Sequence, residues 1–275
     1  MNLNLEDLDL MKRLTKRDIQ RHELNILIAV KEICNSHNLK FYLAGGTLLG
    51  AIRHRGFIPW DDDIDICMPR PDYEKFISLW PKMNQIYVLK SDRLNNWDAP
   101  FTKVIDPTTQ IESVYDERKG SLWIDVFPVD ALPSDVKKVE NIYKQCNFYR
   151  KLLMIAHARL GEGTSQIHKY GKYILKPIAK LIGTDYFSKK LEKIACQIPY
   201  ESADYVGAIT WGLYGVGERM LKSEFEREVE VEFEGYKMPA FSCWDSYLHR
   251  LYGDYMQLPP IDKRQTHNMT VYIKE

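Results

Sequence analysis

The strongest chemical signal in the sequence is an acidic run, Trp-Asp-Asp-Asp-Ile-Asp-Ile, that begins at Trp60. We expect a strand over Trp60–Met68, and side chains along a strand alternate between its two faces. Asp63 and Asp65 would then share one face, together with Asp61, while the alternating isoleucines point into the core. Carboxylates this close repel each other unless a cation lies between them, and Mg²⁺ prefers such oxygen ligands. The alternative is a solvated acidic loop, which would leave the alternating isoleucines unexplained.

A pair of glycines precedes this run. Gly45 and Gly46 follow a short buried strand expected at residues 41–44, and a short helix is expected at residues 47–54. Glycine lets the backbone approach a ligand closely, and the N–H groups at the start of a helix favour an anion. Thr47 can add a hydroxyl group. Such a pair can also be only a tight turn, but with the aspartates downstream it predicts a phosphate group beside the glycines and Mg²⁺ beside the carboxylates.

A third carboxylate, Asp125, lies among large apolar residues in the run Trp-Ile-Asp-Val-Phe. Burying a charge there is costly unless the charge is paired or bound to a metal; the alternative is a structural aspartate held by backbone groups. We expect a strand over residues 122–127, ended by Pro128. A Gly-Gly turn, an Asp-x-Asp strand and a lone aspartate on a later strand together predict a nucleotidyltransferase-like site that could hold two metal ions.

Four further residues could contact a phosphate group or move a proton. Arg53, two helical turns after Gly46, and Lys103 are candidates for binding phosphate, and each could instead be a surface cation. His54 and His267 are candidates for acid–base or hydrogen-bonding roles, and each could instead be structural. The sequence does not identify the general base.

These residues need a scaffold of strands and helices, and the chain predicts one. Apolar residues recur at helical spacing over residues 15–37, where Thr15 and Asp18 resemble a capping box. Residues 228–234 alternate like a half-exposed strand, and a helix is expected at residues 244–252. We therefore expect an α/β (α+β) fold with a nucleotidyltransferase-like mixed-sheet core and helical additions.

The chain is expected to divide into two parts. Residues 1–135 would form an N-terminal helix and the catalytic core. Residues 136–275 would form a mostly helical region whose C-terminal strand pair and helix complete the site.

The composition narrows the possible functions. The chain has 275 residues with 38 basic and 38 acidic side chains, so its formal net charge is zero. A general nucleic-acid binder would be basic, and a disordered chain would have a high net charge and few aromatic residues. No stretch is apolar enough for a transmembrane helix, the first nine residues do not resemble a signal peptide, and the five scattered cysteines indicate reduced thiols. We therefore expect a cytoplasmic protein that does not bind nucleic acid.

The residues of these motifs and their spacing resemble those of the LicD family. This family includes bacterial phosphocholine transferases and, as distant animal relatives, fukutin and fukutin-related protein. The resemblance covers roughly residues 20–270. It is carried by Gly45–Ile66, Arg70–Phe76, Ile124–Asp130, Val231–Gly235 and short pieces between Tyr247 and His267.

This resemblance implies a Mg²⁺- or Mn²⁺-dependent transferase that takes a CDP-activated alcohol, such as CDP-choline, and releases CMP. Phosphocholine would pass to a hydroxyl group of a cell-surface glycan: a teichoic acid, lipopolysaccharide or capsule precursor. By the same resemblance, Asp63 and Asp65 would be metal ligands, Asp125 a third ligand or the base that activates the acceptor, and Asp61 a further acidic position.

Two alternatives stay open at this point. The donor could instead be a CDP-polyol, such as CDP-ribitol, or CDP-glycerol, or the chain could be an inactive binding protein in glycan assembly. The quaternary ammonium of choline favours aromatic faces. The loop Trp211–Gly215, which contains two glycines and two aromatic residues, is therefore our candidate for lining the substrate.

The zero net charge hides a basic segment, because residues 136–200 carry 13 basic and 4 acidic side chains. Lysines at spacings of three and four residues, from Lys169 to Lys180, would lie along one stripe of a helix, which Pro177 could divide. The simpler interpretation is a solvated lysine face whose apolar side packs on the core. The alternative is a peripheral contact with anionic lipid at the inner face of the plasma membrane, near a lipid-linked acceptor.

Overall fold

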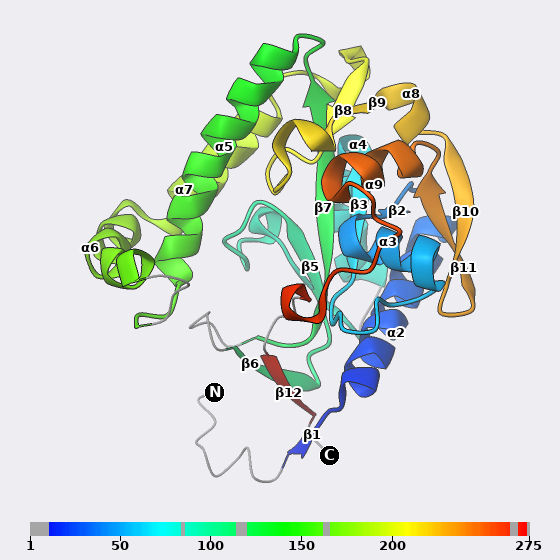
Figure 1. Cartoon of the computed structure of the whole chain (residues 1–275), viewed down its shortest axis with the longest axis horizontal. Helices are drawn as coiled ribbons and strands as arrows, with labels where there is room; N and C mark the ends of the chain where they lie inside the picture. The colour runs from blue at the N-terminus through cyan, green and yellow to red at the C-terminus, as the bar shows by residue number, and fades with distance from the viewer. Residues whose placement is uncertain (1–10, 84–85, 114–119, 162–165, 265–268, 274–275) are drawn as a thin grey trace.

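Figure 1 shows the fold as a computed structural model, which describes residues 11–83, 86–113, 120–161, 166–264 and 269–273. Helices flank a mixed central sheet, so the expected α/β class is confirmed. The sheet has the strand order β2-β3-β7-β5-β4, and β8 and β9 extend it beside β7. The bounds are β2 Tyr42–Leu43, β3 Asp65–Pro69, β4 Val88–Lys90, β5 Thr102–Ile105, β7 Trp123–Leu132, β8 Tyr205–Gly207 and β9 Met220–Leu221.

The long strand β7 organises this sheet. It runs parallel to β3, with Asp125 opposite Asp65, and antiparallel to β5, with Asp125 opposite Lys103. The two carboxylates and the lysine therefore come from three adjacent strands at one level of the sheet.

Pro128 does not end this strand, contrary to the expectation from the sequence. It lies after the residues that pair with β5, Trp123–Val126, and before those that pair with β8, Asp130–Leu132. The N–H of Asp125 points toward β3, where it bonds the carbonyl oxygen of Ile64, so the alternation of a strand turns the nitrogen of Pro128 toward the gap between β5 and β8. The missing N–H of proline therefore leaves no bond of the ladder unmade.

The expected strand over Trp60–Met68 is shorter in the structure, because β3 begins only at Asp65. β2 pairs with β3 at two positions, Ile66 and Cys67, so β2 does not pair with residues 61–64. Three consecutive aspartates also have a low propensity for a paired strand. Asp61 and Asp63 therefore lie in the loop that leads into β3.

Three helices pack on this sheet: α2 Lys16–Ser36, α3 Gly45–His54 and α4 Arg70–Met83. The capping box at the start of α2 is confirmed, because Thr15 and Asp18 each accept the backbone N–H of the other. α2 buries one stripe that includes Ile26 and Val30, and Glu23 lies on that same buried stripe.

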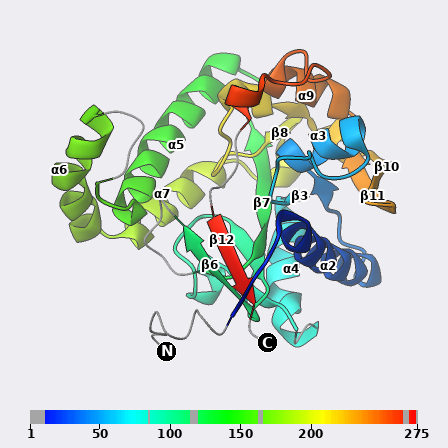
Figure 2. The ribbon, with the colours of Figure 1, turned by 60° about the horizontal axis from the view of Figure 1, so that its bottom comes forward.

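The basic segment is helical, as expected, and forms α5 Val136–His157, α6 Gln166–Ile182 and α7 Thr184–Ala195. These helices share an apolar core of their own, and both views place them at one edge of the molecule, opposite the β10–β11 hairpin (Figures 1 and 2). Pro177 lies inside α6 and does not divide it.

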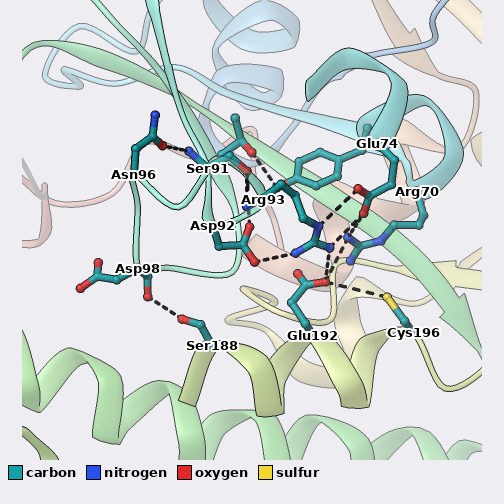
Figure 3. Close-up of polar contacts among 12 residues, drawn as sticks. Arg70, Glu74, Ser91, Asp92, Arg93, Asn96, Asp98, Ser188, Glu192 and Cys196 are labelled. Atoms are coloured by element: carbon teal, nitrogen blue, oxygen red, sulfur yellow. Dashed lines mark hydrogen bonds and ion pairs between the residues drawn. The ribbon is translucent and has the colours of Figure 1, made fainter. Parts of the chain in front are cut away.

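A buried ionic network fastens α7 to the central sheet (Figure 3). Arg70, the first residue of α4, donates two hydrogen bonds to Asp130 of β7, at 2.6 and 2.8 Å. The guanidinium groups of Arg70 and Arg93 both contact Glu192 of α7. A bidentate pair of this kind fixes orientation as well as distance, so the helical layer has a defined position on the sheet.

The C-terminal part surrounds one end of the sheet. The expected half-exposed strand is confirmed as β10 Glu228–Phe233, which pairs with β11 Tyr236–Phe241, and the expected helix is confirmed as α9 Trp244–Tyr252. A second small sheet joins β12 Met269–Ile273 to β1 Lys12–Arg13 and β6 Thr109–Ser113. The short helices are α8 Lys222–Phe225, η1 Asp92–Leu94, η2 Tyr200–Ser202, η3 Gly215–Glu218 and η4 Ile261–Lys263.

None of the helices built from the described residues is long and apolar enough to cross a membrane.

Candidate active site

A cavity of about 240 Å³ opens where β3, β7 and the start of α3 meet. Asp63, Asp65 and Asp125, the three carboxylates predicted as metal ligands, all line it. Asp65 and Asp125 are brought together by the parallel register of β3 and β7. Asp63 reaches the same cavity from the loop before β3, so the strand alternation that we expected is not what places it there.

The glycine pair fits against these carboxylates. Gly45 lines the cavity and has a φ of +52°, a conformation that favours glycine. A Cβ atom added at Gly45 would lie 3.2 Å from Asp65 Oδ2, and one added at Gly46 would lie 3.0 Å from Asp61 Oδ2. The backbone of the turn therefore runs directly beside two acidic side chains, at the N-terminus of α3, where N–H groups favour an anionic ligand. Asp61 is held close to the site but does not line the cavity.

Thr47 supports the strand that carries Asp65. Its hydroxyl oxygen accepts the backbone N–H of Asp65 at 2.8 Å, and its side chain is buried. Thr47 therefore fixes the first residue of β3, and its predicted contact with a ligand stays a prediction.

Lys103 is brought to the carboxylates, as its candidate role requires. Its ammonium nitrogen lies 3.2 Å from Asp125 Oδ1 and 3.6 Å from the centre of the Trp123 ring. The indole N–H of Trp123 donates to Asp125 Oδ2 at 3.0 Å. Asp125 is therefore held from both sides, and a cation lies beside one of the carboxylates that line the cavity.

The carboxylates raise each other's cost of ionisation. Burial and the charges of Asp63, Asp125 and Asp61 raise the pKa of Asp65 well above its usual value, and Lys103 opposes this only in part. Glu23 of α2 lies close to the same cluster and is 1% exposed. Burial and the charges of Asp63, Asp62 and Asp61 raise the pKa of Glu23 well above its usual value.

This cluster has the donors that a hard divalent cation prefers. Several carboxylates share little space, and an additional positive charge would relieve their repulsion. No three His, Cys, Asp or Glu side chains of the described residues are arranged as a preformed metal cluster. The assignment of Asp63, Asp65 and Asp125 as ligands of Mg²⁺ or Mn²⁺ therefore stays a prediction, which the chemistry of the donor set fits.

Arg53 and His54 are not brought to the cavity. They lie at the far end of α3, where the guanidinium group of Arg53 donates to the carbonyl oxygen of Tyr255 at 2.6 Å and to the His54 ring at 2.9 Å. Arg53 therefore holds the segment after α9 against α3. His267, the other predicted histidine, lies outside the described residues.

Aromatic side chains also line the cavity. Trp211, Leu213 and Tyr214 come from the loop that we predict to line the substrate, and Tyr247 and Tyr252 come from α9. The rings of Tyr214 and Tyr252 meet edge to face, with 5.3 Å between their centres.

A fourth carboxylate, Glu218 of η3, lines the cavity beside these aromatic residues. It is 4% exposed, and its Oε1 accepts the N–H of Tyr214 at 3.4 Å. Burial raises the pKa of Glu218 to about 7; the Tyr214 N–H, the Tyr247 hydroxyl and the charges of Arg150 and Arg250 limit the rise. The cavity thus combines the aspartates beside the glycine turn with aromatic side chains and one further carboxylate.

Sequence reasoning missed two acidic residues near the cavity. Glu23 could have been found, because it stands on the apolar stripe of α2, between Ile19 and Ile26, where a charged residue is unexpected. Glu218 follows Gly-Val-Gly in an irregular segment, where no periodicity indicates which side chains are buried.

Comparison with known proteins agrees with this geometry. Residues 38–155 match the family described as LicD/FKTN/FKRP, nucleotidyltransferase domain. The chain is 32% identical to the lipopolysaccharide cholinephosphotransferase LicD of Haemophilus influenzae over 270 residues, which cover 94% of this chain and 98% of that protein.

Two uncharacterised proteins match shorter stretches. One, from Rickettsia typhi, is 39% identical over 64 residues, or 23% of this chain and 21% of that protein. The other, from Rickettsia prowazekii, is 38% identical over 66 residues, or 24% of this chain and 25% of that protein. The match to the Haemophilus influenzae protein is the one that spans the whole site, from the glycine turn to α9, and by it the chain belongs to the LicD family of nucleotidyltransferase-fold proteins.

Proposed function

We propose that this protein transfers phosphocholine from CDP-choline to a hydroxyl group of a cell-surface glycan and releases CMP. The observation that carries the proposal is that one cavity combines three aspartates with aromatic side chains and a further carboxylate. Asp63, Asp65 and Asp125 suit a metal-bound diphosphate, and the aromatic side chains with Glu218 suit a quaternary ammonium group. The similarity to a lipopolysaccharide cholinephosphotransferase supports the same reaction and suggests a lipopolysaccharide-type acceptor.

The reaction needs positioning and charge neutralisation more than covalent help from the protein. The acceptor hydroxyl oxygen would attack the phosphorus atom that carries choline, the bond from that phosphorus to the CMP oxygen would break, and CMP would leave with the bonding electron pair. The hydroxyl proton would pass to a base. Asp125, which lines the cavity, is a candidate for this base as the alternative to its role as a third metal ligand.

The residues around the aspartates have separate tasks in this proposal. Asp63 and Asp65, together with Asp125 where it is not the base, would hold Mg²⁺ or Mn²⁺, which when bound neutralises charge on the diphosphate group. Gly45 lets the backbone N–H groups of the turn approach a phosphate oxygen. Lys103 would contribute a positive charge next to Asp125.

The aromatic lining of the cavity favours choline over the other donors. Ribitol and glycerol present hydroxyl groups, which need several hydrogen-bonding partners when buried. A trimethylammonium group needs aromatic faces and one negative charge, for which Trp211, Tyr214, Tyr252 and Glu218 are the candidates. In this proposal, choline binds beside these residues and the diphosphate binds beside the aspartates.

A panel of donors tests the proposal. The protein is incubated with Mg²⁺ and CDP-choline, CDP-ribitol or CDP-glycerol, with and without an acceptor glycan, and CMP release is measured. We expect release from CDP-choline, stimulated by acceptor, and a loss of at least about a thousandfold for Asp65→Asn. Circular dichroism shows whether that variant is folded. Preferential use of a polyol donor, or unchanged release by folded Asp65→Asn, would contradict the proposal.

A further inference from the structure

The helix α6 exposes an unusual amount of apolar surface. Seven of the large apolar side chains that the structure leaves exposed lie on this one helix, among them Leu181, Ile174 and Ile178 with exposed fractions of 88%, 70% and 51%. Tyr170, Tyr173 and Ile182 are exposed beside them. Scattered exposed apolar residues are normal, but a contiguous apolar face on one helix marks a surface that binds something.

The simpler interpretation of the sequence is that the apolar side of this helix packs on the core, but α6 has the opposite orientation. Lys176, from the lysine stripe, is only 5% exposed, and its ammonium group donates to the carbonyl oxygen of Ala158 at 2.7 Å. Ala158 caps the C-terminus of α5, where unpaired carbonyl oxygens favour a positive charge. Lys176 thus anchors α6 on the protein, and the apolar side of the helix faces outward. The expected packing of that apolar side on the core is therefore wrong.

The place of α6 in the molecule makes this face accessible. Figures 1 and 2 both show α6 as the outermost helix of its layer, on the side away from the hairpin β10–β11. The helix packs mainly against α5 and only slightly against α7. The exposed face therefore lies on a helix that projects from the protein, and it can contact a flat surface that has no matching groove.

We propose that α6 binds the surface of a bilayer containing anionic phospholipid, with Ile174, Ile178 and Leu181 inserted among the acyl chains. An interfacial helix buries one apolar face, while tyrosines lie at the headgroup level and lysines extend toward the headgroup phosphates. Tyr170 and Tyr173 of α6 are exposed and can lie at the headgroup level, and the basic segment of residues 136–200 supplies the positive charge.

Charge favours this occupant over a second copy of the chain. The segment 136–200 carries 13 basic and 4 acidic side chains, and α6 itself carries no acidic residue. A symmetric dimer through α6 would bring two such positive segments together, whereas an anionic bilayer would attract each of them. This surface lies away from the cavity, and the proposal does not depend on the proposed donor.

Vesicle flotation with the full chain tests the proposal. The protein is mixed with vesicles of phosphatidylcholine alone or with added phosphatidylglycerol, without substrate. We expect binding to the anionic vesicles that weakens as salt is raised. Leu181→Asp should weaken this binding by about tenfold or more, because it replaces a leucine that would insert into the bilayer with a charged side chain. Ile86→Asp is the matched control, since Ile86 is 71% exposed and lies outside α6.

Three outcomes would overturn the proposal. The first is no binding to anionic vesicles at low salt, and the second is equal binding by wild type and Leu181→Asp. The third is a dimer in sedimentation velocity that Leu181→Asp disrupts, which would assign the face to a second copy. Since Leu181 is almost fully exposed, its replacement should leave the melting temperature and CMP release from CDP-choline in solution unchanged.

Discussion

The carboxylate of Glu218 provides a direct test of where choline binds. Burial raises its pKa to about 7, so in the unliganded protein near neutral pH it is about half protonated. A trimethylammonium group beside it would favour the ionised form. When CDP-choline binds, Glu218 should therefore lose its proton to the solvent. The affinity for CDP-choline should increase as the pH rises toward 8.

The size of this effect follows from the pKa. If only the ionised form binds, the apparent dissociation constant contains the fraction of ionised Glu218, and it should fall about tenfold between about pH 6 and pH 8. Glu218→Gln removes the charge and should abolish this dependence. At about pH 8 the variant should bind CDP-choline about 30-fold more weakly, which corresponds to ~2 kcal/mol, the interaction of two unit charges about 8 Å apart at an effective dielectric constant of about 20.

Isothermal titration calorimetry at several pH values, in buffers of different ionisation enthalpy, measures both affinity and proton release. CDP-glycerol is the control ligand, because it has the same CDP group and no quaternary ammonium. Glu224→Gln is the control variant, because Glu224 is outside the cavity. The reasoning is refuted if CDP-glycerol shows the same pH dependence, or if Glu218→Gln keeps it.

Three further predictions concern the carboxylates and their partners. Arg70→Ala should lower the free energy of unfolding by about 3–5 kcal/mol in urea titrations, because it leaves the buried carboxylate of Asp130 without its cation. Without metal, the raised pKa of Glu23 makes the native state bind more protons than the unfolded chain above about pH 4.5, so stability should fall as pH rises. Glu23→Gln should then be more stable than wild type at about pH 8 but not at about pH 4, in thermal melts with chelator. Lys103→Met should lower CMP release yet increase the rise in melting temperature that Mg²⁺ produces, because the carboxylate of Asp125 loses its cation.

The sequence was informative where chemistry is encoded locally. The Thr15–Asp18 capping box and the alternation of β10 were predictable, because each depends on residues a few positions apart. The three carboxylates of the site could also be selected, since an aspartate among large apolar residues, such as Asp125, is costly without a reason.

What could not be predicted depends on contacts between distant parts of the chain. Asp63 lies in a loop and not on a strand, because β2 does not pair with the residues before Asp65. Arg53 binds the carbonyl oxygen of Tyr255, about 200 residues further along the chain. The periodicity of the sequence predicted an apolar and a basic face of α6, but not which of them packs on the protein. That depends on a tertiary contact, the hydrogen bond from Lys176 to the C-terminus of α5.

The cost of the aspartate cluster is itself an argument about function. Glu23 is buried and Asp65 is half-buried near further aspartates, and their raised pKa values mean that the ionised cluster opposes folding at neutral pH. The nearby Lys103 offsets this in part for Asp65. A fold that needed these positions only for packing would be more stable with uncharged side chains of similar size. The cluster therefore makes physical sense if a cation binds there during the reaction, and this is the condition under which the proposed transfer of phosphocholine operates.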